Sequence, residues 1–313
     1  MGCEVRALEL STGRDTLLTA ASSDNHAIVD SKERLIAYLV GSPRKDPGWP
    51  SVNKAASAFM KDVVKDCDFD PDDLKHSRGH YPTLSTGFSF GGGPLKPHNI
   101  RINSAKQEHV IEKLVHHPSF VRYSGTCNGT FESHSPRLYR HCNTFLWGIQ
   151  EADPELRKPF ENSVYPATTF NFGPQAATFP HRDSQNIPYG WCAVTALGDY
   201  DYTLGGHLVL WDLKLVIEFP PGSTILIPSA VLTHSNTPVQ DGETRQSFTQ
   251  WCSGSLLRWW TYGLRTEKTL AREAPVLATA FRKAASSRWE EVLGYFSTLS
   301  ELKSDLKASA CAD

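Results

Sequence analysis

Residues 161–265 contain a series of short apolar or alternating runs, each bounded by turn-forming residues such as Pro220-Pro221-Gly222. Runs this short and this closely spaced are typical of the strands of a sandwich or a closed barrel. The sequence therefore predicts a β-barrel core in this part of the chain. The predicted strands cover 166–172, 190–198, 206–211, 214–218, 223–228, 244–252 and 257–263.

The segments on both sides of this core show the periodicity of amphipathic helices. Asp30 is predicted to cap a first helix, which ends at Gly41-Ser42-Pro43. The tail is predicted to be helical as well. Further helices are predicted over 52–66, 104–116, 132–150 and within 266–307.

We expect a loose beginning and one compact domain. Residues 1–25 are polar and rich in serine and threonine, which indicates a flexible segment. Residues 26–313 are expected to form a single domain, because the sequence shows neither an internal repeat nor a clear linker. Its parts are a helical region over 26–160, the barrel core over 161–265 and C-terminal helices over 266–307, so the expected fold class is α+β.

Composition excludes several classes of protein. Hydrophobic residues make up 40% of the 313 residues and charged residues 21%, which excludes a disordered chain. The net charge of −2 does not indicate a nucleic-acid binder, so any contact with a polyanion must come from a local basic patch. Seven cysteines without CxxC spacing indicate reduced thiols in an intracellular protein. We expect neither a signal peptide nor a membrane span.

Three residues of the predicted core are candidates for a metal site: His181, Asp183 and His234. Two imidazoles and one carboxylate occupy one face of an octahedral Fe(II) and leave the other positions open for a co-substrate and oxygen. For His234 the alternative is a surface histidine, because Ser235-Asn236-Thr237-Pro238 has the composition of a turn. The order and spacing of the three residues favour the metal site.

The predicted strand after His234 carries a candidate co-substrate site. Its period of two places Arg245, Ser247, Thr249 and Trp251 on one face. An arginine there can hold the far carboxylate of 2-oxoglutarate through two charge-assisted hydrogen bonds. The alternative is an edge strand with a solvated arginine. The pattern favours a pocket wall, and therefore an oxygenase that uses Fe(II), 2-oxoglutarate and O2.

Four stretches of this core resemble the TET/JBP family of Fe(II)- and 2-oxoglutarate-dependent dioxygenases, in particular its compact fungal members. The resemblance covers about 160–265, and Ser89–Gly93 is only loosely similar to the fungal pattern. It implies a double-stranded β-helix (jelly-roll) core flanked by helices, and oxidation of methyl groups on nucleic-acid bases, chiefly 5-methylcytosine. The matching stretches are HRDSQN at 181–186, GHLVL at 206–210, HSNTP at 234–238 and TRQS at 244–247.

The resemblance also implies roles for single residues. Asn186 would contact the flipped base and Trp251 would stack on it; the alternatives are a loop cap and core packing. His207 would bind 2-oxoglutarate, unless it faces solvent. Ser253 stands where the animal members have a histidine, and their cysteine-rich extension is absent, which leaves the identity of the base open. The remaining implied roles are iron binding by His181, Asp183 and His234 and 2-oxoglutarate binding by Arg245 and Ser247.

Three functions compete. The first is oxidation of 5-methylcytosine in DNA, with N6-methyladenine second. Another is a 2-oxoglutarate-dependent hydroxylase of a protein side chain or small metabolite, which the acidic pI of 6.6 favours. A third is an inactive barrel that only binds a ligand, which the complete ligand set disfavours. Methylated DNA is the expected partner, with no membrane or obligate protein partner, and nuclear localisation is inferred from that substrate alone.

Phosphate contacts are harder to place from the sequence. Arg182 is expected to point away from the iron and to meet either a phosphate or a nearby acid. For each of the other candidates a solvated face is the alternative. These candidates are Arg78, Lys96, Arg101, Arg122, Arg137 and Arg140.

Overall fold

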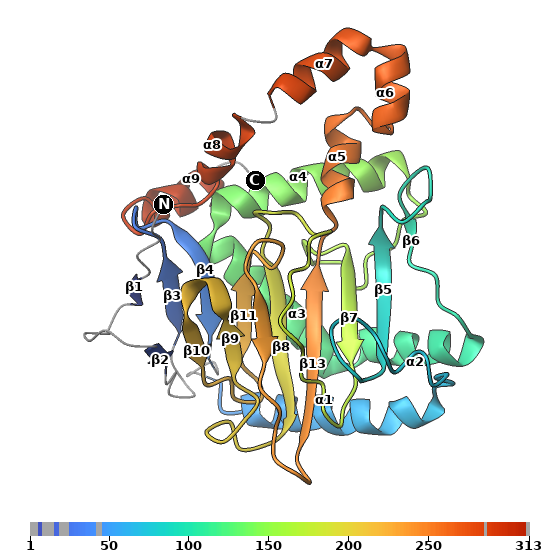
Figure 1. The fold of residues 1–313 in the computed structure, drawn as a ribbon, viewed down its shortest axis with the longest axis vertical. Helices are drawn as coiled ribbons and strands as arrows, with labels where there is room; N and C mark the ends of the chain where they lie inside the picture. Colours follow the sequence, from blue (N-terminus) through green and yellow to red (C-terminus); the bar gives the residue numbers. More distant parts are fainter. Residues whose placement is uncertain (1–5, 8–15, 19–24, 42–45, 285–286, 311–313) are drawn as a thin grey trace.

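Two β-sheets form the centre of the computed structural model, and helices lie behind the larger one (Figure 1). The structure describes residues 6–7, 16–18, 25–41, 46–284 and 287–310. The larger sheet contains, in spatial order, β1 (Arg6–Ala7), β3 (His26–Val29), β4 (Leu35–Val40), β11 (Thr224–Ile227), β8 (Cys192–Asp199), β13 (Thr244–Trp251), β7 (Ala167–Asn171), β5 (Thr83–Ser89) and β6 (His98–Asn99). The smaller sheet contains β12 (His234–Asn236), β9 (Leu208–Leu210), β10 (Leu215–Ile217) and β2 (Thr16–Leu18).

The central strands have the topology of a double-stranded β-helix. In the larger sheet β11, β8, β13 and β7 are antiparallel neighbours, and in the smaller sheet so are β12, β9 and β10. The chain runs from β7 to β8, crosses to β9 and β10, returns to β11, crosses to β12 and returns to β13. A jelly-roll core with helices before and after it confirms the predicted α+β fold class.

One half of the space between the sheets is filled with aliphatic side chains. Ile225 and Ile227 of β11 belong to the same buried cluster as Leu210 of β9 and Ile217 of β10. All four side chains are fully buried. Burial of one such side chain stabilises the fold by about 1.5–3 kcal/mol, so the cluster holds the two sheets together.

Helices cover the other face of the larger sheet. Phe120 packs edge-on against Phe170 of β7, with ring centroids 5.0 Å apart, and lies 5.3 Å from Phe248 of β13. Trp49 donates a hydrogen bond from Nε1 to the carbonyl of Gly222 at 3.0 Å. These contacts fix the sheet from behind and leave its inner face for the site. The helices before the core are α1 (Trp49–Val63), α2 (Ala105–His116), α3 (Pro118–His134) and α4 (Pro136–Ala152), and a 3₁₀ turn covers Val64–Asp66.

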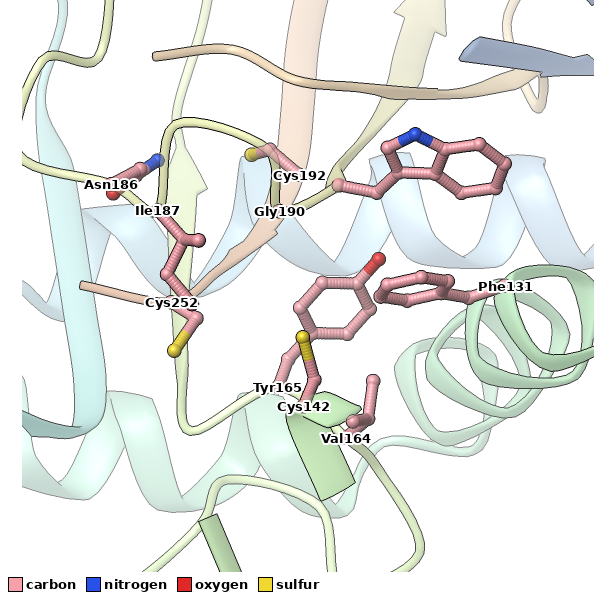
Figure 2. Close-up of a pocket in the computed structure, with 10 residues that line it drawn as sticks. Phe131, Cys142, Val164, Tyr165, Asn186, Ile187, Gly190, Cys192 and Cys252 are labelled. Carbon is pink, nitrogen blue, oxygen red and sulfur yellow. The ribbon is translucent and has the colours of Figure 1, made fainter. Parts of the chain in front are cut away.

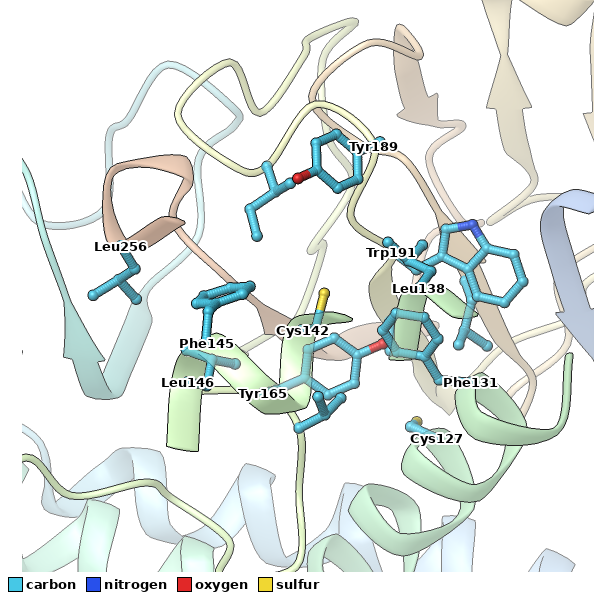
Figure 3. Packing of buried hydrophobic residues seen from close by; sticks show 14 of the residues in the cluster. Cys127, Phe131, Leu138, Cys142, Phe145, Leu146, Tyr165, Tyr189, Trp191 and Leu256 are labelled. Atoms are coloured by element: carbon cyan, nitrogen blue, oxygen red, sulfur yellow. The ribbon is translucent and has the colours of Figure 1, made fainter. Parts of the chain in front are cut away.

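Of the helices after the core, the first and the last pack beside α4, and the second and third extend away from the sheets (Figure 1). In Figure 3, Phe145 and Leu146 of α4 belong to the cluster that also contains Tyr165 and Leu256. An ion pair of 2.8 Å between Arg137 and Asp305 ties the last helix to α4. These helices are α5 (Gly254–Thr261), α6 (Glu267–Glu273), α7 (Pro275–Lys283), α8 (Arg288–Leu293) and α9 (Leu302–Ala310).

The helix predicted from Asp30 to Gly41 is wrong, because these residues form the turn between β3 and β4 and then β4 itself. The Asp30 carboxylate accepts hydrogen bonds from the N–H groups of Lys32 at 2.9 Å and Arg34 at 3.0 Å. Aspartate therefore caps a hairpin turn here instead of a helix. The region 26–160, expected to be helical, consequently also supplies strands to the larger sheet.

Two further predictions need correction. Residues 257–263, predicted as a strand, fall largely in α5, which Ser253 caps by accepting a hydrogen bond from the N–H of Ser255. The sequence pattern also missed α3, since Gly125 and Gly129 lower its helix propensity. The buried stripe of α3, which includes Phe120, outweighs this cost. The remaining predicted strands and the helices near 52–66, 104–116 and 132–150 are confirmed within a few residues.

Most of the segment 1–25, expected to be flexible, lies outside the described residues, but its described pieces form β1 and β2. Cys3 and Cys311 lie outside as well, whereas the other five cysteines are free thiols, as predicted. Among the described helices, none combines the length and the apolar composition that a membrane crossing requires.

Candidate metal centre

His181, Asp183 and His234 converge at one point of the jelly roll. Their candidate ligand atoms all lie within 4.8 Å of one another. Nε2 of His181 is 3.7 Å from Oδ1 of Asp183, and Nε2 of His234 is 4.0 Å from Oδ2. The three side chains are 13%, 10% and 8% exposed in sequence order, so an ion held between them would be largely shielded from water.

Backbone hydrogen bonds fix this convergence. His181 and His234 form an antiparallel bridge, in which the N–H of each donates to the carbonyl of the other at 3.1 and 3.0 Å. The N–H of Asp183 donates to the carbonyl of Ser229 at 3.0 Å, which ties the carboxylate to the segment before β12. His234 therefore opens a strand, and its alternative reading as a turn histidine on the surface is wrong.

Both imidazoles present Nε2 to the site. Nδ1 of His181 lies 2.8 Å from the carbonyl of Phe179, and Nδ1 of His234 lies 2.9 Å from that of Leu232. A carbonyl only accepts hydrogen bonds, so in the neutral rings the proton is on Nδ1 and the lone pair is on Nε2. Burial lowers the pKa of His181, and neighbouring His234 lowers it further, which favours the neutral form that binds metals.

Arg78 contacts the carboxylate of the site, with Nη2 2.7 Å from Oδ1 of Asp183. It lies in a short turn that is closed by a bridge between His76 and Gly79. The contact orients the carboxylate through Oδ1, and Oδ2 is the oxygen nearer to His234. The sequence indicated Arg78 only as a candidate phosphate contact, because no local pattern places this distant loop beside the barrel.

Arg182 pairs with residues other than the three ligands. Its Nη2 pairs with Asp212 at 2.9 Å and its Nε donates to Thr233 at 2.8 Å, so the acid, of the two predicted partners, is present. Besides Arg78, which pairs with Asp183, three more of the phosphate candidates pair with acids within the fold. These pairs are Lys96–Asp153, Arg122–Asp46 and Arg137–Asp305.

The three ligands line a cavity of about 680 Å³, together with three further predicted site residues, Ser247, Asn186 and Trp251. Thr249 lines it too, so of the four residues predicted to share one face of β13 all but Arg245 border the cavity. Sequence reasoning missed the contribution of β5 and β7, although the alternating hydroxyl residues of TLSTGFS were a usable signal. The additional polar lining comes from Thr83, Ser85, Thr169, Asn171 and Asn236.

Hydrogen bonds hold the predicted residues in place. Ser247 accepts from the amide of Asn171 at 2.8 Å, and Trp251 donates from Nε1 to Thr169 at 2.9 Å. Asn186 donates its amide to Ser229 at 3.2 Å. The serine and the tryptophan are thus oriented by neighbouring strands, and the asparagine by the segment before β12.

Arg245 is buried with unused hydrogen-bond donors. It is 1% exposed, and Nη1 donates to the carbonyl of Ala176. Nε and Nη2 have no partner among the described residues. A buried guanidinium without an anion is costly, so the position suits a ligand that brings a carboxylate. Arg245 does not line the cavity itself, but Ser247, on the same face of β13, does.

Two further residues, Tyr81 and Ser89, line the cavity, whereas His207 does not. Tyr81 lines the cavity at 3% exposure, and burial raises its pKa to about 12, so its phenol stays a hydrogen-bond donor. His207 is outside the lining; its N–H donates to the hydroxyl of Thr237 at 2.9 Å. Its contact with 2-oxoglutarate stays a prediction. Ser89, from the loosely similar motif, lines the cavity, and the carbonyl of Phe90 accepts from Ser253.

A second cavity lies behind Asn186 (Figure 2). It measures about 10 Å³ and is enclosed by Tyr165, three cysteines and apolar side chains. This is room for one water molecule at most, so it cannot hold a co-substrate or a base. The cysteines are Cys142, Cys192 and Cys252.

Comparison with known proteins gives a structural likeness without a sequence match. No protein-family model matches the chain, and no curated protein does. NgTET1, solved in complex with 5mC DNA, matches 76% of this chain and 81% of its own, with a TM-score of 0.50 and 12% identity. A 2OG-Fe(II) oxygenase family oxidoreductase from Burkholderia pseudomallei matches 69% and 85%, with a TM-score of 0.34 and 15% identity.

The likeness to NgTET1 extends over most of both chains and concerns the fold. Two histidines and one carboxylate with open positions are the donor set of non-haem Fe(II) oxygenases, and the convergent ligands of this chain fit it. The chain therefore has a TET-like 2OG oxygenase fold, the jelly roll that it shares with NgTET1, and carries in it a His-Asp-His group that could hold a metal ion.

Proposed function

We propose that this protein is an Fe(II)- and 2-oxoglutarate-dependent dioxygenase that oxidises the methyl group of 5-methylcytosine in DNA, with N6-methyladenine as the second candidate base. The observation that carries the proposal is the convergence of His181, Asp183 and His234 beside a polar cavity of about 680 Å³. Bound Fe(II), 2-oxoglutarate and O2 supply the oxidation of a C–H bond, with succinate and CO2 as co-products.

The protein's own contribution begins with the metal. His181 and His234 would bind it through Nε2, and Asp183 through its carboxylate, since these atoms face one another. Arg78 keeps the carboxylate oriented from outside. Such a set of two imidazoles and one carboxylate would leave the other positions of the metal for 2-oxoglutarate and O2.

The co-substrate has a carboxylate at each end. Arg245 would hold the far carboxylate with Nε and Nη2, the two donors that lack partners. Ser247 would add its hydroxyl, and His207 is assigned to the end near the metal. A bidentate contact of this kind orients 2-oxoglutarate as well as binding it.

A methylated base in a duplex cannot reach this cavity unless it is flipped out. Trp251, oriented by Thr169, offers an aromatic surface on which stacking contributes about 1–3 kcal/mol per base. Asn186, oriented by Ser229, offers an amide to the Watson–Crick edge. A cavity of about 680 Å³ has the volume of a typical small-ligand site.

The DNA assignment is supported by the solved NgTET1 complex, which contains 5mC DNA and shares the fold. A hydroxylase of a protein side chain or a small metabolite is the competing function. Nuclear localisation is part of the proposal only through the substrate, and imaging of the tagged protein in its own cells tests it.

Purified protein is given Fe(II), 2-oxoglutarate, O2 and matched duplexes that contain cytosine, 5-methylcytosine or N6-methyladenine. We expect oxidised 5-methylcytosine by mass spectrometry, in proportion to succinate, and none with His181→Ala. Steady succinate production without any oxidised base contradicts the DNA assignment and favours the competing hydroxylase. Unchanged succinate production by His181→Ala contradicts the metal site.

A further inference from the structure

Phe179 is an exposed aromatic residue next in the chain to Thr178, which lines the cavity. Its side chain is 51% exposed, although it lies only two residues before the metal ligand His181. Its ring touches His80 edge-on, with centroids 5.5 Å apart at 89°. An exposed phenyl ring beside a functional cavity suits contact with a partner.

The backbone holds Phe179 rigidly. Its N–H donates to the carbonyl of Arg78 at 2.9 Å, and its own carbonyl lies 2.8 Å from Nδ1 of His181. The hydroxyl of Thr178, the preceding residue, donates to Asn236 of β12 at 3.1 Å. The backbone at Phe179 is thus tied to the metal loop and its neighbour to β12, so little backbone entropy remains to be lost when the ring binds.

Two half-exposed arginines lie near Phe179, one hydrogen-bonded to it through the backbone (Arg78) and one three residues later in the chain (Arg182). Arg78 and Arg182 are each 51% exposed and are anchored by Asp183 and Asp212. A guanidinium has five N–H donors, so each arginine can keep its carboxylate and still contact a phosphate. We call Arg78, Phe179 and Arg182 the arginine rim. It combines an apolar wedge with fixed cations, the combination by which proteins open a base stack.

We propose that Phe179 enters the duplex at the place that the flipped base leaves, with Arg78 and Arg182 on the flanking phosphates. This inference rests on the proposed function. The site would have two parts, since the base is bound by Trp251 and Asn186 inside the cavity and the vacated stack by Phe179 at its rim. A single-stranded substrate leaves no such gap, so Phe179 should matter for the duplex alone.

The test compares a duplex and a single strand of one sequence with one 5-methylcytosine. We expect Phe179→Ala to lower kcat/KM about tenfold or more on the duplex and less than about twofold on the single strand. With 2-aminopurine at the target position, the fluorescence rise on binding should also shrink. Phe179→Trp should restore both. The matched control is Trp147→Ala on α4, which is 63% exposed and should leave the ratio unchanged.

The ratio of duplex to single-strand turnover separates insertion from a damaged metal loop, because loss of iron lowers both rates equally. Equal losses, or an unchanged duplex rate, overturn the insertion and leave the proposed function intact. Wild-type protein that oxidises the single strand alone also overturns the insertion. Wild-type protein that oxidises neither substrate contradicts the proposed function, and the inference falls with it.

Discussion

The two halves of the space between the sheets differ in chemistry, although two strands, β8 and β9, border both. The closed half contains Ile217, Phe219 and Ile225, all fully buried, and the open half contains Ser247 and Thr249 beside the metal ligands. Leu208 and Val194 mark the boundary, because each packs on the apolar cluster and lines the cavity. The closed half holds the sheets together, so the open half can stay polar and hollow.

The boundary between the two halves shows how the apolar cluster helps to position a metal ligand. Leu210 belongs to the apolar cluster, and its partner across the β9–β12 pair is His234. The cluster therefore positions a metal ligand from behind. The open half, in contrast, contains polar groups without partners, namely Nε and Nη2 of Arg245, which lower stability until a ligand binds. Stability and function are separated between the two halves, and four substitutions test this separation.

The largest effect is expected from His234→Ala in the open half. Loss of one of three ligands should lower metal affinity and turnover by more than about 100-fold, since even outer-shell substitutions cost about 10–100-fold. The unfolding free energy of the metal-free protein should change by less than about 1 kcal/mol. Calorimetric titration with Mn(II) and urea unfolding measure the two quantities. His116→Ala on α2, 72% exposed, is the control and should change neither.

Leu210→Ala tests the closed half. A cavity in the apolar cluster should lower the unfolding free energy by about 2–5 kcal/mol. Metal affinity should fall far less than in His234→Ala, because the ligand remains. Val209→Ala, next in the chain but only half-buried, should cost at most about 1.5 kcal/mol. Similar losses for both substitutions in urea would mean that the cluster does not carry the stability assigned to it.

Arg245→Met should separate stability from function within one residue. The substitution removes a buried charge that lacks an anion, so we expect the unfolding free energy without 2-oxoglutarate to rise by about 1 kcal/mol. The affinity for 2-oxoglutarate should fall at least about tenfold, the value of one charged hydrogen bond. Arg272→Met, 75% exposed, serves as control. A destabilised Arg245→Met protein would show that its donors are satisfied in the free state.

The sequence was most informative where a residue type or a spacing has one common structural or chemical role. Alternation identified the inner face of β13, and two histidines with an aspartate indicated a metal site before any topology was known. Both conclusions follow from local chemistry, namely the period of a strand and the ligand preference of Fe(II). The convergence itself depends on the β12 bridge, which no local pattern contains.

The failures have physical reasons as well. Residues 35–40, LIAYLV, suit a strand as well as a helix, and only pairing with β3 and β11 decides between them. Arg78 reaches Asp183 through a loop whose position depends on the whole fold. In α3, tertiary burial overrides weak local propensity. Local patterns thus predicted the chemistry of the site, while long-range packing decided which distant loops complete it.

The smallest effect is expected from Thr169→Val, which alters the support of the base pocket. Thr169 accepts a hydrogen bond from Trp251 and shares another with Ser85 at 2.8 Å. Its neighbour Thr168 lies on the opposite face of β7 and donates to the carbonyl of Thr249 in β13. Loss of a neutral hydrogen bond is worth about 1 kcal/mol, so releasing the Trp251 ring in Thr169→Val should raise KM for methylated DNA about fivefold and lower stability by about 1 kcal/mol. Thr168→Val, the same change on the opposite face, should lower stability by about 1–2 kcal/mol and leave KM unchanged. Steady-state kinetics and urea unfolding of both variants decide the matter: if Thr168→Val raises KM as much as Thr169→Val, the two faces of β7 do not divide stability from substrate binding.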